Sequence, residues 1–319
     1  MRGAINFSLN RTPKMHTTSE PSMCTGIINV DKPAGITSMD VVRKIRKASG
    51  LRRIGHGGTL DPRATGVIPV AVGAATRLLE YLLDGNKSYI AAIELGTRTN
   101  TYDSEGIITE YCDPSEITQE NITDALSNFQ GEIMQTPPMY SAVKIKGKRL
   151  YELARKGVTV HRESRKVSIH NLSFIEFESP VLKIIIECGK GFYVRTFADD
   201  LGQILGCGAF LKSLRRLSSG PFRIEQSTKL NKVLLAFEEG RSFEILQEPG
   251  ICIEEAQRLD LTELETQLVR DGRRIPALAN KNPHEESGMA RAYSPAGHLL
   301  AVMRHDFASS EWRPEKVFN

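Results

Sequence analysis

The stretch Gly55-His-Gly-Gly-Thr-Leu-Asp-Pro-Arg-Ala-Thr-Gly-Val-Ile-Pro-Val-Ala-Val-Gly-Ala-Ala-Thr-Arg77 places one carboxylate among glycines, a proline and a long apolar run. Its four glycines before residue 67, together with Pro62, indicate a backbone that turns tightly and approaches another group closely. Asp61 precedes the proline, so its backbone is biased toward extended or turn geometry. Local chemistry alone favours an ordinary turn in which the Asp61 side chain accepts hydrogen bonds from its own backbone. The alternative is a carboxylate with a role in function.

Upstream, residues 26–38 read Gly26-Ile-Ile-Asn-Val-Asp-Lys-Pro-Ala-Gly-Ile-Thr-Ser38 and predict a short apolar strand that runs into a turn. Thr37 or Ser38 is expected to cap a helix that ends at Gly50. The solvent face of this helix is basic, since residues 41–60 carry six Lys or Arg and no acid. Such a run suits a phosphate-bearing ligand, although a solvated surface would look the same.

Downstream, the apolar periodicity alternates between the helical and the strand period. Helices are expected at 76–83, at 118–129 and after Thr196, and Gly131 is expected to end the second of them. Strands are expected at 87–95, 166–178 and 181–188. A polar loop is expected at 96–106. Because no regular βαβ period is present, these elements predict an α+β fold with a mixed, largely antiparallel sheet and flanking helices. A linker-like composition at 237–250 precedes a small, separate β-rich module at 251–319.

The composition is that of a soluble globular protein. Of the 319 residues 40% are hydrophobic and 25% charged, and no apolar run is long enough to span a bilayer. The five cysteines are scattered, odd in number and without Cys-x-x-Cys spacing, which favours a reducing compartment and disfavours a zinc site. A cytoplasmic monomer is therefore expected.

Two further segments have a biased composition. Residues 142–166 carry nine Lys or Arg against two Glu, a density typical of a phosphate-backbone contact or of a solvated surface. Residues 1–23 are polar, without hydrophobic period, and are expected to be a disordered N-terminal extension. An organelle-targeting role for this extension stays open.

Several kinds of site can be discounted. Gly55-His-Gly-Gly lacks the Gly-Lys-Ser/Thr ending of a phosphate-binding loop and does not fit a dinucleotide fingerprint. The seven histidines show no metal-ligand spacing, and no Gly-x-Ser-x-Gly elbow indicates a serine hydrolase. What remains is one aspartate in a turn, basic surfaces, and the aromatic residues Tyr89 and Tyr193.

Eight separated motifs, in a fixed order, resemble the signature of the TruB family of tRNA pseudouridine synthases. They are Gly26–Ser38, Gly55–Pro69, Lys87-Ser-Tyr89, Pro138-Met-Tyr-Ser-Ala142, Gly147-Lys-Arg-Leu-Tyr-Glu-Leu-Ala154, Gly191-Phe-Tyr-Val-Arg-Thr196, Asp200-Leu-Gly202 and Leu214-Arg-Arg-Leu217. The resemblance covers residues 26–220, whereas the final module resembles only loosely an RNA-binding domain of PUA type. One departure is Gly57, where many relatives carry threonine.

The resemblance implies an isomerase that acts on the T-arm of tRNA. In this family the uridine at position 55 is converted to pseudouridine by breaking C1′–N1 and forming C1′–C5, without cofactor or metal. It also implies a pseudouridine synthase catalytic domain at 24–245, with a basic RNA-binding insertion near 136–157. A PUA-like RNA-binding module would follow at 251–319.

Three residues match the family's catalytic positions. Asp61 matches the aspartate that attacks the nucleoside, and the resemblance leaves open attack at C1′, attack at C6 or a role as base. Arg195 matches an arginine that pairs with this carboxylate and would hold it ionised. Tyr89 matches the tyrosine that stacks on the target base, although a tyrosine in a strand is often simply core.

Further positions match groups that hold the substrate. Tyr193 and the backbone at Leu217 correspond to contacts around the flipped uridine, and His56 to a histidine that wedges into the T-loop and helps to extrude the target. Lys32 is expected to support the active-site loop or to bind a phosphate.

Two rival functions stay open. One is a guide-directed, dyskerin-type enzyme acting on ribosomal RNA, which the basic insertion at 136–157 disfavours. The other is a non-catalytic tRNA-binding or tRNA-folding chaperone. The presence of Asp61, Tyr89 and Arg195 together disfavours a dead enzyme.

Overall fold

The computed structural model describes residues 24–318 except 142, 146 and 278–287. The predicted extension at 1–23 lies outside the described residues. The larger part of the fold contains β1 Gly26–Lys32, α1 Ser38–Ser49, β2 Ile54–His56, β3 Thr65–Val72, the 3₁₀ helix η2 Gly73–Leu78, α2 Leu79–Asp84, β4 Lys87–Leu95, β5 Thr97–Thr99, β6 Ile108–Tyr111, α3 Gln119–Ser127, β7 Gly131–Gln135, β8 Lys144–Ile145, β9 Lys148–Arg149, α4 Leu150–Ala154, β10 Arg165–Glu178, β11 Val181–Cys188, α5 Val194–Ile204, β12 Ala209–Ser219, β13 Phe222–Arg223, η3 Ile224–Gln226, β14 Thr228–Lys229, α6 Leu230–Glu238 and η4 Ser242–Glu244.

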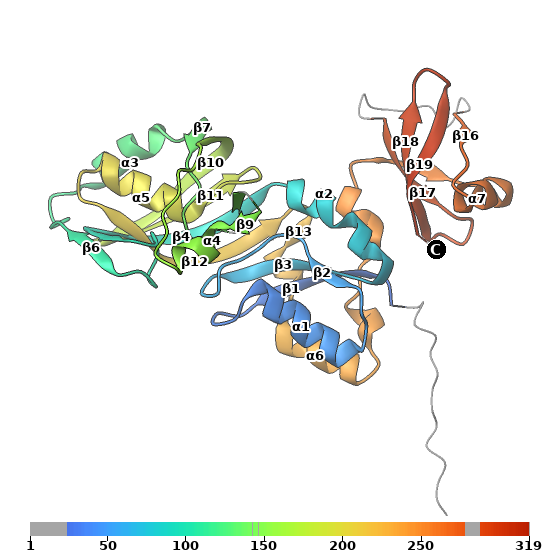
Figure 1. The fold of residues 1–319 in the computed structure, drawn as a ribbon, viewed down its shortest axis with the longest axis horizontal. Coiled ribbons are helices and arrows are strands. Elements are labelled where there is room, and N and C mark those ends of the chain that lie inside the picture. The colour runs from blue at the N-terminus through green and yellow to red at the C-terminus, as the bar shows by residue number, and fades with distance from the viewer. Residues whose placement is uncertain (1–23, 142, 146, 278–287, 319) are drawn as a thin grey trace, which may run out of the picture.

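A second, smaller part forms the module near the C-terminus. It contains η5 Pro249–Ile253, β15 Gln257–Asp260, α7 Glu263–Arg270, β16 Ile275–Pro276, β17 Met289–Tyr293, β18 Leu299–Asp306 and β19 Glu311–Val317. Its five strands form one sheet in the order β15-β17-β18-β19-β16. In Figure 1 this module projects from the side of the larger part that carries α2.

The main sheet consists of two halves that are antiparallel except for the short parallel pair of β14 with β1. Its strand order is β14-β1-β3-β12-β4-β11-β10-β7, with β2 beside β3 and β13 beside β12. The halves join where β12 pairs in parallel with β3, at only two positions, Arg215↔Thr65 and Arg216↔Gly66. We call this join the seam. The predicted fold class, a mixed and largely antiparallel sheet with flanking helices, is confirmed (Figure 1).

Helix α1 begins and ends where its sequence dictates. The hydroxyl of Thr37 accepts a hydrogen bond from the Asp40 backbone N–H at 3.0 Å, and the Asp40 carboxylate accepts one from the Thr37 N–H at 2.9 Å, which forms a capping box. Gly50 ends the helix in the left-handed region, with φ +69°. The apolar face packs on β1 and β3 beside α6, so the basic face of α1 stays in solvent.

Strand β3 is buried on both faces, which explains its uninterrupted apolar sequence. Ile68, Val70 and Val72 face α1 and α6, whereas Val67 and Ala71 face η2, α2 and the module. The opening stretch is therefore the structural centre of this half of the sheet, and it leads directly from the Asp61 loop into the core.

Gly66, at the start of β3, allows the seam to close. Its φ is +102°, and a Cβ at this position would lie 2.8 Å from the backbone nitrogen of Arg216 and still closer to its carbonyl oxygen. We expect Gly66→Ala to lower the free energy of unfolding by about 3–5 kcal/mol, because backbone strain and a collision with rigid backbone add. Urea denaturation measures the loss.

Gly131→Ala is the matched control for this prediction. Gly131 also has a positive φ, +91°, but a Cβ there meets nothing within 4 Å. Only the conformational penalty applies, about 1–2 kcal/mol. Equal losses for the two variants would contradict the close approach of β3 and β12.

The segment predicted as a helix at 76–83 is helical throughout, first as the 3₁₀ helix η2 and then as α2. Two other local predictions were wrong. The predicted loop at 96–106 contains β5, which pairs with β6 in a hairpin. Gly131 does not close α3, since Asn128 caps that helix and Gly131 starts β7.

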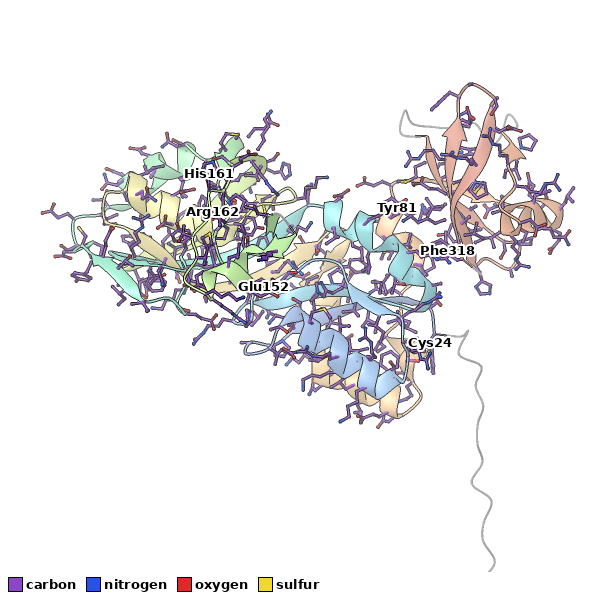
Figure 2. All side chains as sticks on the ribbon, in the orientation of Figure 1. Cys24, Tyr81, Glu152, His161, Arg162 and Phe318 are labelled. Atoms are coloured by element: carbon purple, nitrogen blue, oxygen red, sulfur yellow. The ribbon has the colours of Figure 1, made fainter. Side chains whose placement is uncertain are left out.

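The segment at 237–250 is not a free linker. Ile27 and Gln247 exchange two backbone hydrogen bonds, at 2.8 and 3.0 Å, so the chain here runs against β1. The module beyond is not isolated either, because its residues share an apolar cluster with β1, β3 and α2. Figure 2 shows Tyr81 and Phe318 at this junction, and both pack against the cluster.

Candidate active site

The loop between β2 and β3 presents the carboxylate of Asp61. The Ala64 N–H donates to the Asp61 carbonyl at 3.1 Å, which closes a tight turn with Pro62 at its second position. The turn thus uses the main-chain carbonyl of Asp61, and the side chain is directed to another partner. The predicted turn is present, and its carboxylate is available for other chemistry.

Residues of β1 and α1 hold this loop on both sides of Asp61. The buried Ser38 hydroxyl donates to the Leu60 carbonyl at 3.0 Å and accepts from the Leu60 N–H at 2.8 Å. The fully buried ammonium of Lys32 donates to the Pro62 carbonyl at 3.0 Å and to the carbonyls of Pro33 and Ile36. Burial lowers the pKa of Lys32 to about 8. Of the two roles expected for Lys32, this geometry fits loop support, because a side chain without exposed surface cannot meet a phosphate.

Arg195, in the first turn of α5, is the partner of Asp61. Its Nε lies 2.9 Å from Asp61 Oδ2 and its Nη2 3.2 Å from Oδ1, a two-point contact. The same guanidinium contacts Asp103 Oδ2 at 3.4 Å and donates to the Tyr140 carbonyl at 2.9 Å. The Arg195 side chain is only 8% exposed, so its position is fixed on several sides.

The electrostatics of Asp61 are balanced between opposing effects. The Asp61 side chain is 40% exposed, but many protein atoms lie close to its carboxylate. These atoms displace water from the charge and thereby raise the pKa of Asp61. The charge of Arg195 lowers the pKa and opposes the burial, whereas the charges of Asp103 and Glu105 raise it further. Arg195 is therefore the main group that favours the ionised, nucleophilic form of Asp61.

Asp103 is a site residue that the sequence did not reveal. It lies in the β5–β6 turn, where its Oδ1 accepts from the Glu105 N–H at 3.0 Å and from the Thr101 hydroxyl at 2.6 Å. The preceding Tyr102 has φ +63°, a conformation that few non-glycine residues adopt. The turn residues around position 103 were visible in the sequence, but nothing local indicated that this turn reaches Arg195.

Tyr89 and Arg216 lie opposite each other on the adjacent strands β4 and β12, next to the seam. They are register partners on β4 and β12, and their relative exposures are 9% and 1%. Burial raises the pKa of the Tyr89 phenol, whereas the charge of Arg216 and its hydrogen bond to the phenol lower it. The charge of Asp61 also acts on this phenol, which places the two side chains in one electrostatic environment.

Tyr193 directly precedes α5 and is fixed through its backbone. The Gln135 side-chain amide accepts from the Tyr193 N–H at 2.7 Å and donates to its carbonyl at 3.1 Å. Burial raises the pKa of the Tyr193 phenol, on which the charges of Arg195 and Asp61 also act. Gln135, at the end of β7, is another residue that sequence reasoning missed.

Leu217 occupies a β-bulge. On β12, Arg216 pairs with Tyr89 and Ser218 with Ser88, so the intervening residue has no register partner on β4. A bulge removes its residue from the regular hydrogen-bond ladder. The backbone of β12 is therefore irregular at Leu217, next to Tyr89.

His56 ends β2, immediately before the Asp61 loop. Burial lowers its pKa, and the charge of Arg216 lowers it further, so the imidazole is neutral at pH 7. Its Nδ1 has no hydrogen-bond partner within the described ranges. The histidine thus places an aromatic ring, whose buried Nδ1 is unpaired there, beside the loop.

The site opens into a depression beside Asp61. Its lining includes the loop, the β5–β6 turn, Arg195 and residues 211–214 of β12. In the part of the chain that the structure describes, no group of three His, Cys, Asp or Glu is arranged to hold a metal ion. Nor is any helix there long and apolar enough to cross a bilayer. A positioned carboxylate, a buried cation and an aromatic ring are suited to covalent catalysis on an aromatic ligand.

Comparison with known proteins gives the class of this site. Family profiles match at residues 46–194, "TruB family pseudouridylate synthase (N terminal domain)", at 195–247, "tRNA pseudouridylate synthase B C-terminal domain", and at 257–319, "tRNA Pseudouridine synthase II, C terminal". The chain has the fold of a pseudouridine synthase, an isomerase.

Individual relatives are similar over most of their length. "tRNA pseudouridine synthase B" of Dehalococcoides mccartyi is 46% identical over 293 residues, covering 92% of this chain and 96% of the relative. The protein of that name in Haemophilus influenzae is 37% identical, covering 87% of this chain and 89% of the relative. The chain therefore belongs to the TruB family of pseudouridylate synthases.

A solved structure supports the fold. A chain in the "Crystal Structure of a Cbf5-Nop10-Gar1 Complex" has a TM-score of 0.72 and 27% identity, covering 92% of this chain and 85% of that chain. The match extends over both the main sheet and the module, as its coverage requires. The β-rich C-terminal module is consistent with the PUA-like domain expected from the sequence.

Proposed function

We propose that this chain isomerises the uridine at position 55, in the T-loop of tRNA, to pseudouridine, as a stand-alone enzyme. The names of its relatives specify tRNA as their substrate. The observation that carries the proposal is the two-point contact between Asp61 and the buried Arg195, with the Tyr89 phenol close enough to be affected by the Asp61 charge.

Asp61 acts as the nucleophile in this proposal. The carboxylate is partly exposed and is held at a fixed angle by Arg195, whose charge favours the ionised form that attack on a bound nucleoside requires. The net reaction breaks C1′–N1 and forms C1′–C5; N1 gains a proton and the hydrogen at C5 is lost to solvent. The bond that Asp61 forms to the nucleoside breaks again before the product leaves, which regenerates the carboxylate. Atoms and charge balance without any added reactant.

The target base is held by three groups near the seam. Tyr89 stacks on the uracil, Tyr193 completes the wall of the pocket, and the freed peptide groups of Leu217 bind the base edge. Aromatic stacking with hydrogen bonds to a base edge is the usual recognition of an unpaired nucleotide. The base has to leave the T-loop stack, and the His56 ring beside the Asp61 loop helps to extrude it.

The basic insertion near 136–157 closes over the RNA backbone. Its first residues already contact the site, since Tyr140 binds Arg195 and the Thr196 hydroxyl donates to the Thr136 carbonyl at 3.4 Å. Nine Lys or Arg between 142 and 166 supply the charge for phosphate contacts. The same segment therefore contacts the T-arm and holds the catalytic Arg195, so binding of the RNA also helps to fix the position of this arginine.

The domain boundaries form part of the same proposal. Residues 24–245 make up the catalytic domain and 251–319 an RNA-binding module, a division that the profile matches ending at 247 and starting at 257 support. The apolar cluster at the junction fixes the module to the catalytic domain. The enzyme acts as a monomer in the cytoplasm.

An unmodified tRNA transcript tests the proposal. The purified chain, without guide RNA, is incubated with tRNA carrying [5-³H]uridine, and tritium release and the position of pseudouridine are measured. Product is expected at the T-loop uridine and is lost when that uridine is replaced by cytidine. Absence of product from the unaltered chain, or product only with a guide RNA and ribosomal RNA, contradicts the proposal.

A further inference from the structure

Arg216 is a buried cation that the reaction described above does not use. Its relative exposure is 1%, and within the described ranges its guanidinium bonds to backbone carbonyls and to the Tyr89 phenol instead of to a carboxylate. Its neighbour Arg215 points to the other face of β12 and pairs with Asp31 at 3.1 Å. A buried charge without a counter-ion is costly, and an apolar side chain of equal volume would serve a purely structural role at least as well.

The guanidinium ties together both arms of the Asp61 loop. Its Nε donates to the Val67 carbonyl at 2.6 Å, on the arm that follows the loop. Its Nη atoms donate to the carbonyls of Gly58 at 3.2 Å and Thr59 at 3.5 Å, on the arm that precedes it. These hydrogen bonds fix the separation of the two arms between which Asp61 is presented.

The same side chain reaches Tyr89 on the neighbouring strand β4. Arg216 and Tyr89 are register partners on adjacent strands, and the bulge at Leu217 directly follows. The Arg216 backbone also packs against Gly66 of β3. One residue therefore contacts β3, both arms of the loop and the buried phenol.

We propose that Arg216 is a positioning residue for the isomerisation, which couples the Asp61 loop to the Tyr89 phenol so that both meet the extruded uridine in one fixed arrangement. This inference rests on the roles proposed for Asp61 and Tyr89. The planar fork of arginine suits the task, because several rigid donors are directed at once to separate acceptors. The positive charge of Arg216 next to the Tyr89 phenol also contributes to this coupling, because it orients the dipole of the phenol hydroxyl.

A cycle of variants tests the coupling. The rate of tritium release at saturating enzyme and the tRNA Kd are measured for Arg216→Met, Tyr89→Phe, the double variant and the parent. Arg215→Met is the matched control, because it makes the same change one residue away on the opposite face of β12. Circular dichroism establishes that each variant folds.

We expect Arg216→Met to be slower by about 100-fold, the effect of a small misplacement of reacting groups, with the tRNA Kd within about threefold of the parent. Tyr89→Phe is expected to lose at least about tenfold. If Arg216 acts through the phenol, the double variant is no slower than the slower single variant, because one shared function has been removed. Arg215→Met stays within about threefold of the parent.

Other outcomes overturn the inference. They are an Arg216→Met rate within threefold of the parent, a full rate for Tyr89→Phe, or losses that multiply in the double variant. Should the methionine variant not fold, Arg216→Lys is carried through the same cycle, since it keeps the charge and loses the fork. An inactive parent would contradict the proposed function itself and is thereby distinguished from failure of this inference.

Discussion

Asp61→Asn is expected to abolish turnover, lowering the single-turnover rate by about four orders of magnitude or more. Asparagine keeps the size of the side chain and an oxygen for Arg195, but a neutral amide is a very poor nucleophile. Because Arg195 still finds an acceptor, the loop is expected to keep its shape, and the tRNA Kd to stay within about threefold. Tritium release at saturating enzyme, together with filter binding of the same tRNA, measures both quantities.

Asp31→Asn is the matched control for this change. Asp31 also lies on the main sheet and also pairs with an arginine, Arg215, at 3.1 Å, but within the described ranges neither residue bonds to Asp61 or Arg195. Its rate should stay within about threefold of the parent. Product formed by Asp61→Asn at the T-loop uridine would contradict the nucleophile assignment while leaving the proposed reaction intact.

Local sequence signals predicted the elements whose cause is local. Helix α1 was correctly predicted because Thr37 caps it and Gly50 ends it, and both effects act within a few residues. Strands β4, β10 and β11 followed from alternating apolar positions with the correct period. The 3₁₀ geometry of η2 was missed, since its sequence carries the same apolar period as an α-helix.

The contacts between distant segments were not accessible in this way. The polar sequence of β5 predicts a loop. The segment forms a strand because it pairs with β6 and packs beside β12, and its own residues do not indicate this. Asp103 reaches Arg195 only after that hairpin has formed. Arg216 looked like one cation in a basic motif, and charge in a sequence does not reveal burial.

The motifs identified Asp61, Arg195 and Tyr89, and the structure brings these three together. Their roles stay predictions, which the variants above test. For Lys32 the sequence left two roles open, support of the active-site loop and binding of a phosphate. Its burial against three backbone carbonyls favours support of the loop. Burial is a property of the folded chain, which explains why motif matching named the residues correctly but could not separate these two roles.

The position of the site follows from the seam. Two largely antiparallel halves meet at β12 and β3 through only two residue pairs, so the ladder there is interrupted on one side by the Asp61 loop and on the other by the Leu217 bulge. Unpaired backbone, a carboxylate and an aromatic ring therefore collect at one place in an otherwise continuous sheet. Breaks of this kind are where irregular backbone can serve a ligand.

Arg195→Met is expected to lower the rate by about three orders of magnitude and to change its pH dependence. Without the guanidinium, burial and the charges of Asp103 and Glu105 raise the pKa of Asp61 with nothing comparable to oppose them. Because attack requires the ionised carboxylate, the acid limb of the pH–rate profile moves to higher pH. Arg195→Lys, which keeps the charge without the fork, is expected to lie between the variant and the parent in both rate and pH profile.

The stability of Arg195→Met has the opposite pH dependence. At neutral pH the variant leaves two carboxylates without their shared cation, at a cost of about 1–3 kcal/mol in the free energy of unfolding. A carboxyl whose folded pKa lies above its unfolded value of 3.8 loses stability as the pH rises through that interval, so the deficit shrinks as the pH falls. Urea denaturation between pH 4 and pH 8, beside rates over the same range, therefore separates a catalytic effect from a structural one. A deficit that is constant with pH would show that Arg195 does not control the ionisation of Asp61.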